Sequence, residues 1–256
     1  MRYTGLRPPH IEIGFLLGFA IFGSLPKDNG LRKVIEYYFK QAINGESIEI
    51  IIASLIMDLE LIKEKCEKDF KKFKEKLLHC DEGNFYGIRC EIAVNSLLLR
   101  RGISFIQRES PDFQCINDEN IHIECTSSHL IDGSENSEKV FRKIKKSVRD
   151  KNGKIYASLK IILFIDLTNL NYSNNNHLFS DPQFDTEISK ILSRTKYGAL
   201  LFNINSLFND GNDIVQRSNC HVSPAKHIDD NFTNILKLLC KETIFDTHKG
   251  ISSKFP

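Results

Sequence analysis

The stretch SPDFQCINDENIHIECTSSHL, residues 110–130, holds the pattern that decides the fold. Side chains of a β-strand point alternately to its two faces, so residues 121–126 predict a strand with one apolar and one polar face. The polar face carries Glu124 at its centre, in a strand that also holds two isoleucines. A buried carboxylate is costly unless it is paired or bound to a metal ion. We therefore expect Glu124 to belong to a functional site.

A second carboxylate, Asp112, lies on the strand predicted just before this one. The intervening turn is short, so a hairpin brings Asp112 near Glu124. Two neighbouring carboxylates repel each other, and a divalent cation relieves that repulsion; oxygen ligands suit Mg²⁺ or Mn²⁺. A third acid, Glu91, lies on the predicted helix 85–101, on the face that carries its apolar residues. We expect Glu91 to point inward as a further candidate ligand.

The pattern around this stretch predicts an α/β protein. Its central part reads as a helix over 85–101, strands over 103–107, 112–116 and 121–126, a helix over 136–151 and a strand over 159–167. Further strands and helices follow. Residues 1–80 are predicted to be helical, with helices over 31–44 and from Glu46 to about Cys80. A break at 81–84 separates the two parts. We therefore predict a helical N-terminal subdomain, 1–80, and a second domain, 81–256.

Composition indicates a globular chain with an ordinary balance of residue types. Of 256 residues, 41% are apolar and 27% are charged, and the net charge is only +2. Any nucleic-acid binding must then come from a local patch. Seven cysteines without a CxxC pair favour a reducing setting, so we expect a cytoplasmic protein. The longest apolar run, 13–25, is too short to span a bilayer, and no membrane partner is expected.

Positive charge is concentrated in one predicted helix. Residues 139–154 hold eight Lys or Arg and one Asp, a local charge of +7 that leaves −5 for the rest of the chain. Val140, Ile144 and Val148 are four residues apart, which predicts a buried stripe with the basic residues outward. The helix is either an ordinary solvated one or a contact for phosphate backbones, which would carry no base specificity. The candidate contacts are Arg142, Lys143, Lys145, Lys146 and Arg149.

Over about residues 84–168, the sequence resembles the PD-(D/E)XK nuclease superfamily, which has the restriction-endonuclease-like fold. The resemblance is carried by Pro111-Asp112, by Glu124-Cys125-Thr126 and by the helix acid Glu91. It implies an αβββαβ core in which Asp112, Glu124, the backbone carbonyl of Cys125 and Glu91 hold Mg²⁺ or Mn²⁺. It further implies an endonuclease that hydrolyses phosphodiester bonds in DNA, or in RNA, with a homodimer as a natural way to cut both strands.

The sequence departs from this family at the motif lysine, because Thr126 stands in its place. Three alternatives follow. A lysine of the next helix, Lys139 or Lys143, reaches the site; Gln114 or Thr126 positions the attacking water by hydrogen bonding; or the site is inactive, and the protein binds nucleic acid or another protein without catalysis. In a further alternative, residues 1–80 bind a partner and the α/β part is a scaffold.

Overall fold

The computed structural model describes residues 3–4, 32, 49–116, 120–128, 137–158, 160–173, 178–209 and 213–240. These residues form an α/β fold, as the sequence predicts, with a seven-stranded mixed sheet in the order β1-β7-β6-β5-β4-β3-β2. The apolar run 13–25 and, apart from Arg32, the predicted helix 31–44 lie outside the described residues. None of the helices formed by the described residues is long and apolar enough to cross a lipid bilayer. All seven cysteines are free thiols.

The chain divides into two compact units, and its described part passes between them after Ser96, after Ile204 and after Ser218. The second unit holds residues 97–204 and 219–240, with the gaps given above. The prediction placed a boundary between residues 80 and 81. The first passage between the two compact units falls within a helix, α5 (Glu82–Arg100).

Two helices precede α5 in the first unit: α3 (Glu49–Lys65) and α4 (Glu67–His79). The single long helix predicted up to Cys80 is therefore wrong. It is broken at Cys66, whose φ of −150° and ψ of 86° lie outside the helical region. Neither Gly nor Pro marks this position, so the break has no local sequence signal. Side-chain hydrogen bonds join α5 to both helices: Ser96 donates to Asp58 at 2.7 Å in a buried contact, and Asn95 donates to Asp69 at 3.1 Å in a partly buried one.

Three antiparallel strands open the second unit, and a parallel strand follows them. These are β2 (Phe105–Gln107), β3 (Phe113–Cys115) and β4 (His122–Ser127), then helix α6 (Ser137–Asn152) and β5 (Ile161–Asp166), which is parallel to β4. A parallel pair needs a long crossover connection, and α6 supplies it. Gly102, at a φ of +64°, follows α5 as a glycine cap.

The remaining elements extend the sheet beyond β5. They are α7 (Thr168–Ser173), the 3₁₀ helix η1 (Leu178–Ser180), α8 (Phe184–Leu192), β6 (Ala199–Asn209), β7 (Asp213–Pro224) and α9 (Asp230–Cys240). The short strand β1 (Tyr3–Thr4) pairs with β7. Strand β6 is parallel to β5, so α7 and α8 form a second crossover.

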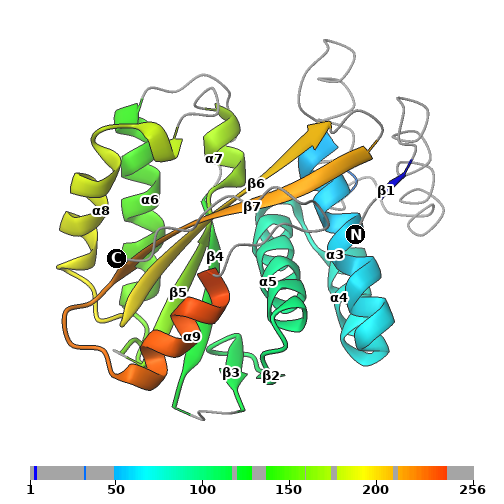
Figure 1. Ribbon diagram of the computed structural model, residues 1–256, viewed down its shortest axis with the longest axis horizontal. Helices are drawn as coiled ribbons and strands as arrows, with labels where there is room; N and C mark the ends of the chain where they lie inside the picture. The colour runs from blue at the N-terminus through cyan, green and yellow to red at the C-terminus, as the bar shows by residue number, and fades with distance from the viewer. Residues whose placement is uncertain are drawn as a thin grey trace. The chain divides into compact units, whose positions relative to one another are not determined.

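Strand β5 is buried along its whole length, as a central strand covered on both faces should be. Its residues Leu163 and Ile165 share one apolar cluster with α6 and α8, and Figure 1 shows these two helices side by side along the strands. The predicted stripe of α6, Val140, Ile144 and Val148, is buried in this cluster. Glu124 lies in register with Leu163, so the polar face of β4 is turned toward α6.

We predict that Phe184→Ala, at the start of α8, lowers the free energy of unfolding by about 3–5 kcal/mol. The Phe184 ring is 1% exposed and lies 5.7 Å from the ring of Phe202, so its removal leaves a cavity between α8 and the sheet. Urea denaturation followed by circular dichroism measures the loss. Leu238→Ala, at a 42% exposed residue of α9, is the control and should cost no more than about 1 kcal/mol. Equal losses in the two variants would contradict this account of the core.

Candidate active site

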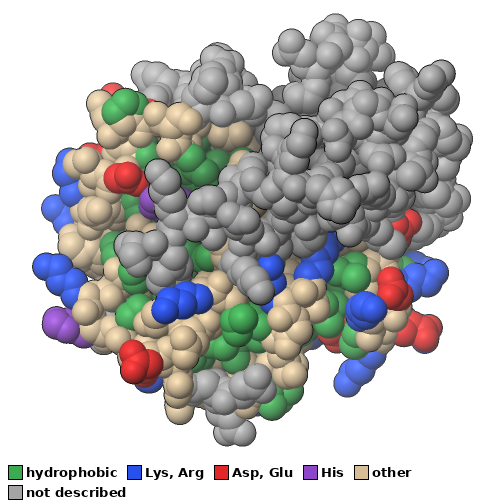
Figure 2. Space-filling model, in the orientation of Figure 1, with side chains coloured by type: hydrophobic (Ala, Val, Ile, Leu, Met, Phe, Trp, Pro, Cys, Tyr) green, Lys and Arg blue, Asp and Glu red, His purple; other side chains and the backbone are tan. Residues whose placement is uncertain are grey.

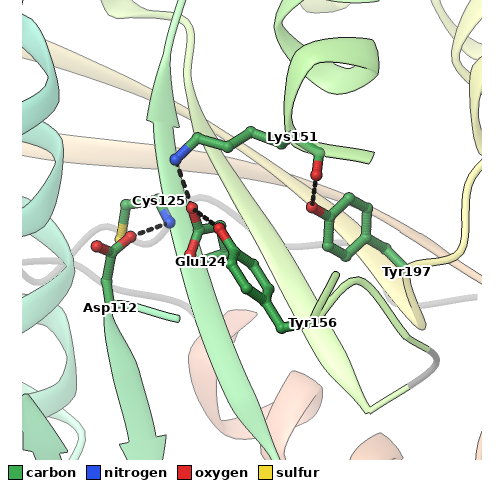
Figure 3. Close-up of polar contacts among 6 residues, drawn as sticks. All are labelled: Asp112, Glu124, Cys125, Lys151, Tyr156 and Tyr197. Carbon is green, nitrogen blue, oxygen red and sulfur yellow. Dashed lines mark hydrogen bonds and ion pairs between the residues drawn. The ribbon is translucent and has the colours of Figure 1, made fainter. Parts of the chain in front are cut away.

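The β3–β4 hairpin brings the two predicted acids to neighbouring positions. Its register pairs Phe113 with Ile123, so Asp112, one residue before β3, comes opposite Glu124. The carboxylate of Asp112 accepts a hydrogen bond from the backbone N–H of Cys125 at 2.6 Å (Figure 3). Asp112 is therefore held against the peptide that follows Glu124, as the short turn predicts.

The carboxylate of Glu124 is buried, with only 2% of the residue exposed. Its Oε1 is held by two groups, the ammonium of Lys151 and the phenol of Tyr156, which donates at 2.8 Å (Figure 3). Its Oε2 is buried without a hydrogen-bond partner among the described residues. A buried carboxylate oxygen in that state is costly, so Oε2 is the atom of this site best suited to a further ligand.

Lys151 reaches Glu124 because of the path of the crossover helix. Helix α6 follows β4 and must return along the sheet to the start of β5, so its last turn lies beside the first residues of β4. The lengths agree, since 16 helical residues span about 24 Å and six strand residues about 20 Å. Lys151 is the second-last residue of α6, and Glu124 is the third residue of β4.

The electrostatics of the site keep Lys151 charged. Burial alone lowers the pKa of Lys151, but its hydrogen bond to Glu124 and the negative charges of Glu124 and Asp112 outweigh burial and raise this pKa above its ordinary value. Both carboxylates therefore act on one ammonium group. Burial, assisted by Glu124, raises the pKa of Tyr156 against the opposing hydrogen bond from Ser110, so its phenol stays protonated and donates.

Further hydrogen bonds fix the end of α6 and the turn that follows it. The buried Tyr197 donates its hydroxyl to the backbone carbonyl of Lys151 at 2.7 Å, which satisfies one of the carbonyls that a helix end leaves open. The side chain of Asn152 accepts from the backbone N–H of Lys196 at 2.8 Å. Tyr156 donates to Glu124, so it joins the turn after α6 to β4. The site is thus held in place before any ligand binds.

Two predicted site residues make other contacts. Glu91 belongs to the first unit, where its carboxylate pairs with the ammonium of Lys76 on α4. Gln114 accepts a hydrogen bond from the guanidinium of Arg108 at 2.6 Å. Neither contact involves Asp112, Glu124 or Lys151.

The predicted lysines of α6 lie nearer the start of the helix than Lys151. Lys139 is exposed and about 18 Å along the helix from Lys151, and the half-buried Lys143 is about 12 Å from it. Thr126 is half-buried on β4, two residues beyond Glu124 and on the same face. The lysine of α6 that contacts Glu124 is Lys151, not the predicted Lys139 or Lys143. The direction of a crossover helix is the signal that would have selected Lys151.

The donor atoms partly fit a divalent metal ion. Asp112 and Glu124 supply carboxylate oxygens, of which the buried Oε2 of Glu124 is not hydrogen-bonded. Magnesium is often held by one or two carboxylates, with waters and substrate phosphates completing its shell. The described residues contain no group of three or more His, Cys, Asp or Glu side chains arranged to hold a metal. The ligands fit a cation shared with a substrate better than a closed structural site.

The predicted nucleic-acid contacts of α6 lie mainly on its outer face. Lys143 is half-buried, and the other four are exposed: Arg142, Lys145, Lys146 and Arg149. Two of them also pair locally with acids of the same helix, Arg142 with Glu138 at 3.0 Å and Arg149 with Asp150 at 3.8 Å. Such exposed pairs are weak and leave the cations accessible.

No match to this chain was found among protein-family models, among curated proteins or among solved structures.

We predict that Lys151→Met lowers the free energy of unfolding by about 3 kcal/mol near pH 8, because it leaves the Glu124 carboxylate buried and unpaired. Since the pKa of Lys151 is raised on folding, its contribution is complete below the ordinary lysine pKa of about 10.4 and is lost as pH rises through the folded value. Urea denaturation between pH 8 and pH 11 should show the difference from wild type shrinking at the alkaline end.

The double variant Glu124→Leu/Lys151→Met should recover most of this loss, because it removes both charges. Lys154→Met, at an exposed lysine three residues away, is the control and should change stability by no more than about 0.5 kcal/mol. A constant difference across the pH range would refute the pairing of Lys151 with Glu124 in solution.

Proposed function

We propose that this protein is a divalent-metal-dependent nuclease that hydrolyses phosphodiester bonds, with DNA as its expected substrate. The observation that carries the proposal is the contact of Lys151 with Glu124 beside Asp112. The sequence resembles a nuclease family whose motif requires an acid, a second acid and a lysine, and it lacks the lysine at the motif position. Lys151 supplies an ammonium group to the same carboxylate from the following helix.

The order of elements supports a restriction-endonuclease-like core. Helix α5, strands β2, β3 and β4, helix α6 and strand β5 follow one another in the αβββαβ order that the resemblance implies. Strands β2 to β4 are antiparallel and β5 is parallel to β4, which makes the sheet mixed. The candidate site lies on β4 and at the end of α6.

In this proposal Asp112 and Glu124 hold the cation, with the carbonyl of Cys125 as a further candidate ligand. A bound Mg²⁺ or Mn²⁺ would polarise the scissile phosphate and lower the pKa of a water molecule. Lys151 is a cation at neutral pH because its pKa is raised, so its role is to donate hydrogen bonds and to offset negative charge on the phosphate. Tyr156 keeps Glu124 in place from the opposite side of Oε1.

The charge distribution supports a nucleic-acid substrate. On the face drawn in Figure 2, the visible Lys and Arg side chains are interspersed with acidic and apolar ones, in keeping with a net charge of only +2. Helix α6 differs, because its outer face carries Arg142, Lys145, Lys146 and Arg149, and the same helix carries Lys151. Phosphate contacts made by these residues would lie on the element that completes the site, and they would carry no base specificity.

We predict that the purified protein cleaves plasmid DNA or oligonucleotides in Mg²⁺ or Mn²⁺, and that Asp112→Asn, Glu124→Gln and Lys151→Met each lower the rate at least about a hundredfold. Gel assays with duplex DNA, single-stranded DNA and RNA measure cleavage. Calorimetric titration with Mn²⁺ measures metal binding, which Glu124→Gln should weaken.

The matched controls for this experiment are Glu187→Gln and Lys190→Met, which break an exposed acid–lysine pair of α8 with a separation of 2.6 Å. Both should keep wild-type activity. Absence of cleavage with all three substrates, together with retained nucleic-acid binding, would refute the catalytic proposal and favour the inactive binding module instead.

We predict that Lys145→Gln/Lys146→Gln weakens binding of duplex DNA and reduces the slope of log K against log salt by up to about 2, because each neutralised phosphate contact contributes about 0.9. Fluorescence anisotropy at several salt concentrations gives the slope. Lys71→Gln/Lys72→Gln, at an adjacent exposed pair on α4, is the control. An equal slope change in both variants would show that α6 has no special part in binding.

A further inference from the structure

The turn that follows α6 presents one apolar side chain to solvent beside the candidate site. The backbone N–H of Ala157 donates to the carbonyl of Lys154 at 3.1 Å, which closes a turn over residues 154–157. Ile155 and Tyr156 are its two central residues. Ile155 is fully exposed, at 105% of its reference area, the highest value among the large exposed apolar side chains of the described residues.

Hydrogen bonds of the turn keep Ile155 in this exposed position. The backbone N–H of Lys154 donates to the carbonyl of Lys151, and the phenol of Tyr156 donates to Glu124 at 2.8 Å. The turn is therefore fastened at both of its sides, and the residue next to Ile155 in the chain touches the buried carboxylate. Ile155 cannot move far from the site without breaking these bonds.

A single exposed isoleucine is ordinary on a protein surface, so exposure alone indicates nothing. The residues around Ile155 are what indicate a binding role. It lies between the exposed Lys154 and the site residue Tyr156, at the end of the helix that carries the exposed basic residues. Proteins that bind nucleic acids often place an apolar side chain among cations, so that the cations contact phosphates while the apolar group packs against a base.

We propose that Ile155 contacts the nucleic-acid substrate by packing against an unstacked base next to the scissile phosphate. This inference rests on the proposed nuclease function. It adds that at least one base of the bound nucleic-acid strand is unstacked at the site. Lys154 contacts the adjoining phosphate. Single-stranded or locally opened nucleic acid is then the preferred ligand, because its bases can leave the stack at low cost.

The chain contains no tryptophan, which makes a direct test possible. Ile155→Trp introduces a single tryptophan at the proposed contact, and an exposed position should accept it without loss of folding. Leu238→Trp, at the partly exposed residue of α9, is the matched control. Each variant is titrated in EDTA, to prevent cleavage, with a single-stranded oligodeoxynucleotide and with one of equal length in which central residues are abasic. Binding is followed separately by anisotropy of a labelled strand.

We expect the intact oligonucleotide to reduce the emission of the Ile155→Trp variant at least about twofold by stacking, the abasic one to reduce it little, and Leu238→Trp to change with neither. Ile155→Ala should weaken affinity for the intact strand roughly fivefold to tenfold and leave affinity for the abasic strand unchanged. Bound oligonucleotide with unchanged emission from the Ile155→Trp variant overturns this inference alone. Failure of the wild-type protein to bind any oligonucleotide overturns the proposed function together with it.

Discussion

The arrangement of the second unit depends on one buried carboxylate. Glu124 is placed on a strand whose two faces are both covered, where an unpaired charge would be costly. Its Oε1 is compensated by Lys151 and Tyr156, which reach it only because α6 ends level with the start of β4. Tyr197 in turn holds the carbonyl of Lys151. The crossover helix, the turn after it and the loop before β6 are all positioned with respect to this one group.

The two carboxylate oxygens of Glu124 have different surroundings, because one is hydrogen-bonded and the other is not, within the described part of the chain. Oε1 is saturated by a cation and a phenol, which serves stability. Oε2 is buried and not hydrogen-bonded, on a carboxylate whose neighbour Asp112 is held by a backbone N–H. A site that satisfied both oxygens internally would be more stable, but it would have no atom left for a ligand. Functional sites commonly leave such polar groups open.

Local sequence patterns predicted β2 to β5, α6 and the proximity of Asp112 to Glu124, because strand alternation, helical spacing and a short turn are all local properties. Lys151 could not be found in the same way, since its place depends on the direction in which α6 crosses the sheet. Glu91 points inward from the apolar face of its own helix, as expected, but its partner there is Lys76 of α4. The helix break at Cys66 was not predicted, because no Gly or Pro lies at that position.

The groups of the site come from one contiguous segment, Asp112 to Tyr156, which is about 45 residues long. Bringing its ends together loses little chain entropy, because the cost of loop closure rises with the length of the loop. A chain still growing during synthesis could therefore assemble this constellation once β5 has emerged, and only the support from Tyr197 would have to wait for later residues.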